Sequence, residues 1–132
     1  MHISLVRLDE AHNVLLNETK ALIDLTSKTL VQYLQHQDHM SLEVIPSQIN
    51  EVAGALLLLG VKAGSQALRT SARFIQKHFE GNQPLSAEQV DLLLDPLASA
   101  DMLIENLKNK QPVLQSMFNI ALDSSQKLQS VA

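Results

Sequence analysis

Apolar residues recur at helical spacing along most of the 132-residue chain. The longest such pattern covers residues 4–36, where Leu8, Leu15 and Leu22 repeat every seven residues and no proline or glycine interrupts. Apolar positions at spacings of three, four and seven are typical of an amphipathic helix. The pattern therefore predicts one long first helix, followed by a polar loop at about 37–41.

Proline and glycine delimit a second and a third helix. Pro46 lacks a backbone N–H and suits a first helical turn, so the second helix is expected to start at residue 43 or 46. Gly60 tolerates the left-handed backbone that ends many helices, which puts the end of the second helix at residue 59. The third helix is predicted over about 62–80, with Gly81 at its end.

A capping box predicts the start of a fourth helix. Ser86 and Gln89 match the pattern in which two side chains satisfy the backbone N–H groups of a helix start. This helix is expected to run to about residue 109, and Pro112 to begin a last helix over 112–132.

These elements predict an all-α fold. Short connections make successive helices antiparallel neighbours, so we expect an antiparallel four- to five-helix bundle. Aromatic residues are only 3% of the chain, and an aliphatic core suits a helix bundle better than a β-sandwich. We expect one domain over 1–132, with residues 1–3 as a tag remnant or a flexible start. The abrupt C-terminal end and the absence of an output domain favour a fragment of a larger signalling protein.

Charge and composition exclude several classes of function. The net charge is −4, the pI is about 5.6 and no Lys/Arg stripe is evident along the sequence, so we expect no nucleic-acid partner. The absence of cysteine excludes disulfides and thiol catalysis. The longest apolar run, residues 52–61, is half of the roughly 20 residues that span a bilayer. We expect no membrane insertion, and a cytoplasmic location because no secretory signal follows Met1.

Histidines offer little metal chemistry. His36, Asp38 and His39 lie close together in sequence, but a third strong ligand is missing and a polar loop explains them better. His12 and His78 are predicted to lie on the surface beside charged neighbours. We therefore expect no metal and no cofactor.

The second predicted helix has two distinct faces. One is an apolar stripe that anchors the helix in the bundle, formed by Ile45, Ile49, Val52, Leu56 and Leu59. The other face groups Asn50, Ala53, Gly54 and Leu57, where a surface helix would normally carry charge. Glycine inside a helix costs about 1 kcal/mol relative to alanine. Gly54 is explained either by close helix packing or by the approach of another molecule.

Residues 50–60, N-E-V-A-G-A-L-L-L-L-G, resemble the signature of histidine phosphotransfer (HPt) domains, which are four-helix modules. Val52, Gly54 and Gly60 match that signature, whereas Asn50 stands at the place of the reactive histidine and Ala53 at that of its lysine. An amide nitrogen has a delocalised lone pair and cannot replace the imidazole as nucleophile. The resemblance therefore implies an HPt-like bundle without phosphotransfer chemistry.

The chain also resembles FimL and the FimL-like segments of ChpA/PilL-type chemosensory kinases. The similarity is carried by "SLVRLDE" at residues 4–10, by "NEVAGALLLLGVKAGSQAL" at residues 50–68, and by Pro112 and Asn119. This resemblance implies a role in a chemosensory or two-component pathway that controls type IV pili and twitching motility.

The resulting expectation is a non-catalytic protein-interaction module, with Asn50, Ala53, Gly54 and Leu57 as its binding surface. Its partner would be a receiver domain or another signalling or pilus-regulatory protein. Two alternatives stay open: an active phosphotransfer domain that uses His78, and a structural dimerisation bundle that buries its leucines against a second copy.

Overall fold

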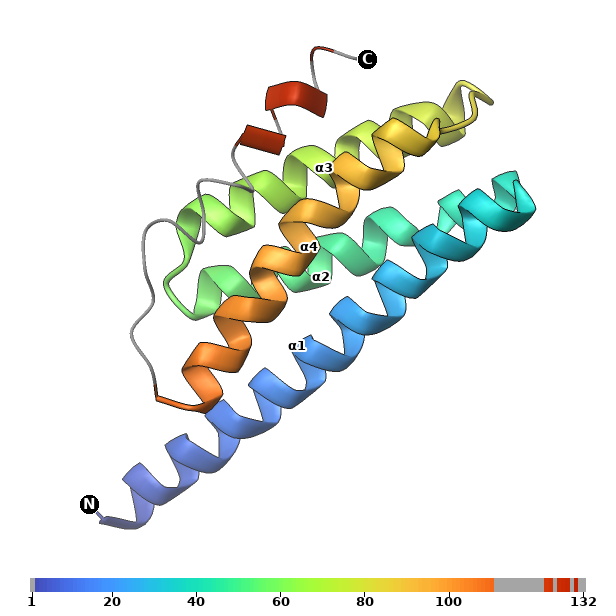
Figure 1. Ribbon diagram of the computed structural model, residues 1–132. Helices are drawn as coiled ribbons and strands as arrows, with labels where there is room; N and C mark the ends of the chain where they lie inside the picture. The colour runs from blue at the N-terminus through green and yellow to red at the C-terminus, as the bar shows by residue number, and fades with distance from the viewer. Residues whose placement is uncertain (1, 111–122, 125, 129, 131–132) are drawn as a thin grey trace.

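Four α-helices and one short 3₁₀ helix make up the main body of the protein. The computed structural model describes residues 2–110, 123–124, 126–128 and 130, with side chains from His12 onward. The helices, shown in Figure 1, are α1 (His2–His36), η1 (His39–Glu43), α2 (Ile45–Leu58), α3 (Lys62–Glu80) and α4 (Ala87–Lys108). No strand occurs in these ranges. The predicted all-α bundle is confirmed, while most of the predicted helix over 112–132 lies outside the described residues.

The helices pack around the bundle in sequence order. α2 lies against α3, and α1 packs against both α2 and α4, as Figure 1 shows. α3 and α4 close the bundle on the remaining side. Since the short turn at 59–61 joins α2 and α3, these two helices run antiparallel.

The predicted boundaries are close to the observed ones, with two differences. α1 starts at His2, two residues before the predicted start at residue 4. The loop expected at 37–41 is also partly wrong, because η1 begins at His39. The Asp38 carboxylate caps η1 by accepting a hydrogen bond from the Met40 backbone N–H at 3.2 Å. The polar stretch that suggests a loop therefore also contains the N-cap residue of a short helix.

The predicted helix signals act as expected at two junctions. Gly60 has a φ of +84°, and the N–H of Val61 donates to the carbonyl of Leu56 at 2.8 Å, which ends α2. At the start of α4, the Ser86 hydroxyl accepts from the Gln89 N–H at 3.1 Å, while the Gln89 side chain accepts from the Ser86 N–H at 2.9 Å. The capping box is therefore present.

The core is mainly aliphatic, with Tyr33 and Phe74 as aromatic members, and it continues through all the helices. Four residues of the predicted anchoring stripe are at most 1% exposed: Ile45, Ile49, Val52 and Leu56. The fifth, Leu59, is the C-cap of α2 and is only partly buried. The stripe packs against apolar residues of the other helices, which include Leu16, Ile23, Leu30, Leu68, Ile75, Leu93 and Leu97. No helix in the described part of the chain is long and apolar enough to cross a membrane.

Candidate docking surface

The four residues predicted as the binding surface do not share one environment. Asn50 is exposed, Leu57 is 49% exposed and Gly54 is partly exposed. Ala53 is fully buried at 0%, so its assignment to the surface is wrong. Each helical residue advances by about 100°, and this rotation puts Ala53 on the core side of α2, beside the anchoring stripe.

No steric contact within the described residues requires a glycine at position 54. A Cβ built on this glycine would meet no atom of the described residues within 4 Å, apart from its own helix backbone and chain neighbours. Close packing against another helix of the described residues therefore does not account for Gly54. The explanation that remains from the sequence is the approach of another molecule.

Asn50 lines a shallow groove between α2 and α3. The groove has a volume of about 360 Å³ and is lined by Leu42, Glu43, Pro46, Ser47, Asn50, Gln76, Phe79 and Glu80. Gln76 donates a hydrogen bond from Nε2 to Oε1 of Glu80 at 3.1 Å. Among the described lining residues there are two carboxylates and no Lys or Arg, so the groove is unfavourable for a phosphoryl group.

The outer face of α3 carries a basic stripe that reading along the sequence missed. Lys62, Arg69, Arg73 and Lys77 are all exposed, and no ion pair involves them within the described residues. Their spacings of seven, four and four place them on one side of a helix. The expectation that the chain carries no Lys/Arg stripe is therefore wrong. The helical spacing of these cations was the available signal.

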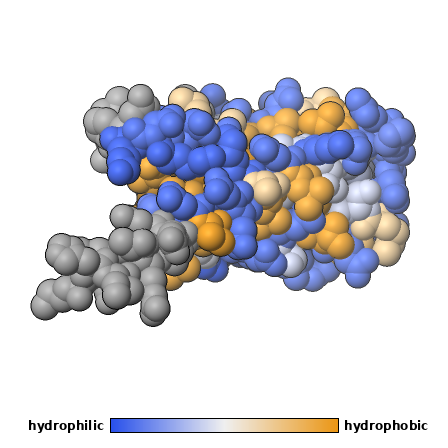
Figure 2. Space-filling view, turned by 90° about the horizontal axis from the view of Figure 1, so that it is seen from below, coloured by the Kyte–Doolittle hydropathy of each residue, from blue (hydrophilic) through white to orange (hydrophobic). Residues whose placement is uncertain are grey.

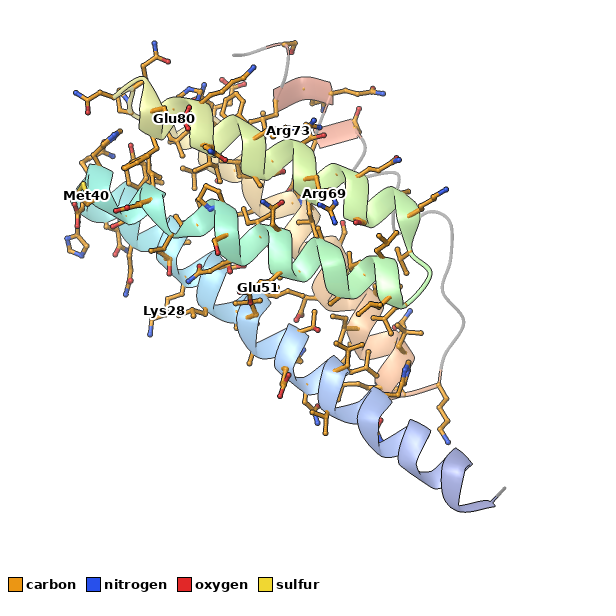
Figure 3. All side chains as sticks on the ribbon, turned by 180° about the vertical axis from the view of Figure 1, so that it is seen from behind. Lys28, Met40, Glu51, Arg69, Arg73 and Glu80 are labelled. Atoms are coloured by element: carbon orange, nitrogen blue, oxygen red, sulfur yellow. The ribbon has the colours of Figure 1, made fainter. Side chains whose placement is uncertain are left out.

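Helical register brings part of this stripe next to the exposed face of α2. Gln76 and Asn50 both line the groove. Seven residues make about two helical turns, so Arg69 lies on the same side of α3 as Gln76. For the same reason, Leu57 lies on the same side of α2 as Asn50. Because α2 and α3 run antiparallel, Arg69 is level with the Leu57 end of α2. Figure 3 shows Arg69 and Arg73 one turn apart on α3, which lies beside α2. We call this surface, formed by Asn50, Gly54, Leu57, Arg69 and Arg73, the α2–α3 face.

Comparison with known families identifies the chain. The FimL C-terminal domain matches residues 6–125, which is most of the sequence. The chain belongs to the FimL C-terminal domain family. No curated protein and no solved structure matches it. The FimL resemblance is thus confirmed and supports a role in type IV pilus-related signalling, while the phosphotransfer-like detail stays a prediction.

His78 does not lie on the surface of this FimL-type domain, contrary to the prediction. Its side chain is buried at 9% exposure and its ring lies 4.3 Å from that of Phe74. Nδ1 is 3.0 Å from the carbonyl oxygen of Phe74, and because a carbonyl only accepts, Nδ1 carries the proton. At 9% exposure, the ring offers little access to a phosphodonor. His12 is exposed, as predicted.

The other histidines do not form a metal site in the described residues. His39 donates from Nε2 to the carbonyl of Phe79 at 3.0 Å and stacks on the Phe79 ring at 5.2 Å. His36 is exposed at the end of α1. Across the described ranges, no group of three or more His, Cys, Asp or Glu side chains could hold a metal ion. His39 therefore has a structural partner that links η1 to the end of α3.

A second groove lies between α1 and α2. Its volume is about 400 Å³, and it is lined by Leu15, Glu18, Thr19, Ala21, Leu22, Leu25, Glu51 and Ala55. Leu25 is 51% exposed. Figure 2 shows that hydrophobic residues reach the surface in patches between hydrophilic ones. The lining of this groove includes two glutamates, Glu18 and Glu51, whereas the α2–α3 face includes two arginines, Arg69 and Arg73.

Proposed function

We propose that this FimL-type domain is a non-catalytic interaction module, a degenerate HPt-like domain that binds a protein through its α2–α3 face. The observation that carries the proposal is the exposed Asn50 beside Gly54, whose missing side chain has no packing reason in the described chain. An internal glycine destabilises a helix relative to alanine, and no contact inside the described domain requires one here. We infer that Gly54 leaves the helix backbone open to contact with another molecule.

The groove chemistry favours binding over phosphotransfer. Asn50 offers an amide in place of an imidazole, so no nucleophile faces the groove at this position. Glu43 and Glu80 would repel an incoming phosphoryl group. The alternative histidine, His78, is buried against Phe74. The domain would therefore not be an enzyme.

Membership of the FimL family supports the proposed class of partner. A FimL-type domain in type IV pilus-related signalling would bind a receiver domain or another signalling or pilus-regulatory protein, in the cytoplasm. The exposed Leu57, next to Gly54 on α2, would supply the apolar contact at the centre of this interface.

The first test compares Gly54→Lys with wild type in a pulldown with the 132-residue chain as bait, followed by direct binding measurements with each recovered protein. Ala98→Lys is the matched control, because Ala98 is also a small, exposed helical residue but lies on α4. We expect at least one partner that Gly54→Lys loses and Ala98→Lys keeps. If no partner depends on Gly54, the proposed surface is wrong.

The second test addresses the chemistry. Incubation with a small-molecule phosphodonor or a phosphorylated receiver domain should leave every histidine of the chain unlabelled. Acid-labile phosphate on any histidine would contradict the non-catalytic proposal, and a His78→Gln variant would show whether His78 accepts it.

A second candidate function is homodimerisation, which one observation favours. Leu57 and Leu58 are 49% and 79% exposed at the end of α2, and adjacent exposed leucines are a common feature of interfaces. Leu56 is buried in the core of its own chain, so only part of the leucine run is free to meet a second copy.

A further inference from the structure

The charge distribution on α3 differs from that of the whole protein. The chain has a net charge of −4, yet four of its ten Lys and Arg residues lie on the outer face of this one helix. They span about 22 Å, or roughly four turns, and the first acidic residue on that face is Glu80 at the end of α3. The opposite face of α3 is core, so the cations lie on an outward, solvated surface.

The two arginines are placed to cooperate with the apolar part of α2. Arg69 lies on the α2 side of α3 by its seven-residue spacing from Gln76, and Arg73 is one turn further along. Gly54 and Leu57 provide open backbone and an exposed apolar side chain on the neighbouring helix. Arginine forms two parallel hydrogen bonds with a carboxylate, which gives geometric specificity as well as attraction.

We propose that the occupant of the α2–α3 face is an acidic amphipathic helix of a partner protein. Its apolar side would lie on Gly54 and Leu57, and its carboxylates would bind Arg69 and Arg73. This inference rests on the proposed function, because it names the partner chemistry for the same surface.

The structure also indicates how the charged residues of the bound helix are distributed along the face. The groove around Asn50 ends at Glu43 and Glu80, which disfavour carboxylates there. The acidic residues of the partner must therefore lie toward the Leu57 end of α2, and its neutral or basic residues toward Glu80.

A protein fits these observations better than a membrane or a nucleic acid. A membrane-binding helix inserts its apolar face into lipid, but the apolar face of α3, including Leu68, Ala72 and Ile75, is already buried in the core. A nucleic acid would meet the net negative charge of the domain beyond the stripe, and the two glutamates of the groove. A partner with both apolar and acidic groups matches the neighbouring Leu57 and Arg69.

The test uses defined peptides and the 132-residue chain. Three helical peptides of about 18 residues, or five turns, share one leucine stripe and are flanked by Glu, by Lys or by Gln. Binding is measured by fluorescence anisotropy at two salt concentrations, with duplex DNA and phosphatidylglycerol vesicles as the other probes. We expect the Glu peptide to bind at least about tenfold tighter than the Lys peptide, and less tightly at high salt.

Variants locate the binding. Arg69→Glu combined with Arg73→Glu should weaken binding of the Glu peptide at least about tenfold. Lys28→Glu, at an exposed residue of α1, makes the same charge change as Arg69→Glu alone; it should leave binding unchanged, whereas Arg69→Glu alone should weaken it. Circular dichroism melting confirms that each variant folds. Equal binding of the Glu and Lys peptides, equal loss with Lys28→Glu, or arginine-dependent binding of DNA or vesicles alone would overturn the inference.

Gly54→Lys separates the two proposals. If a partner protein depends on Gly54 but not on the two arginines, the docking surface stands and the acidic-helix inference fails. If it depends on neither, both fail.

Discussion

The phenol oxygen of Tyr33, near the end of α1, accepts a hydrogen bond from the backbone N–H of Leu85 at 2.8 Å. Tyr33 is 1% exposed and Leu85 is 2% exposed, so water cannot replace either partner easily. The bond joins α1 to the residue just before the capping box of α4. One buried side chain thereby holds the α3–α4 connection against the core.

Tyr33→Phe removes this acceptor while keeping most of the ring packing. The Leu85 N–H would then be buried without its partner, which costs about 1–3 kcal/mol. We expect the free energy of unfolding from urea titration to fall by that amount, with an unchanged m-value. A loss below about 0.5 kcal/mol would mean that water reaches the Leu85 N–H after all.

Replacing Gly54 and Gly60 by alanine should change the stability of the protein in opposite directions. Gly54→Ala adds a methyl group that meets no described atom within 4 Å and should stabilise the protein by about 0.5–1 kcal/mol. Gly60→Ala places a Cβ at a φ of +84° and should destabilise it by about 1–2 kcal/mol. Thermal and urea unfolding of both variants measure the contrast. Destabilisation by Gly54→Ala would restore a packing role for this glycine.

Substitution by aspartate should destabilise the protein far more at Ala53 than at Asn50, although the two positions are only three residues apart. Ala53→Asp buries a carboxylate in the core and should cost several kcal/mol, since the site is 0% exposed. Asn50→Asp changes an exposed side chain and should stay within about 0.5 kcal/mol. The free energies of unfolding of the two variants decide this. Similar values would contradict the burial of Ala53.

The ion pairs of Lys20 predict a pH dependence of stability. Lys20 Nζ lies 3.1 Å from Asp101 and 3.0 Å from Glu105, which link α1 to α4. Its hydrogen bond to Glu105, followed by that to Asp101, raises the pKa of Lys20 above 10.5. The same Lys20 hydrogen bond lowers the pKa of Glu105 below 4.5.

The sign for each group follows from the direction of its shift. The contribution of Glu105 is present above its ordinary pKa of 4.5 and is lost as the pH falls through the lowered value. The contribution of Lys20 is present below 10.5 and is lost as the pH rises through the raised value. Lys20→Gln should therefore lower the melting temperature at neutral pH and have a smaller effect well below pH 4.5. Lys28→Gln is the control, and a pH-independent difference for Lys20→Gln would contradict the assignment.

The oligomeric state tests the dimerisation candidate. Light scattering of wild type and Leu57→Lys should give the same molar mass if the α2–α3 face serves a different protein. A dimer that Leu57→Lys converts to a monomer would instead favour self-association through the end of α2. Gln66→Lys is a suitable control, because it changes an exposed residue of α3 near that end.

Much of the fold followed from local sequence patterns. The heptad leucines predicted the long α1, the capping box of Ser86 and Gln89 predicted the start of α4, and Gly60 predicted the end of α2. These signals are local because helix periodicity, capping and glycine φ depend on residues a few positions apart. The FimL resemblance likewise rested on short segments, and the family match over residues 6–125 confirmed it.

The candidate site depended on information that no local pattern contains. Ala53 and His78 were assigned to the surface, yet both are buried, because the neighbouring helix decides which flank of a helix meets the core. Arg69 is distant from Asn50 in sequence and joins its surface only through the antiparallel packing of α2 and α3. The sequence by itself determined the helices and the residues that anchor them. Tertiary packing alone decided which side chains stayed exposed together, since burial is a property of neighbours in space.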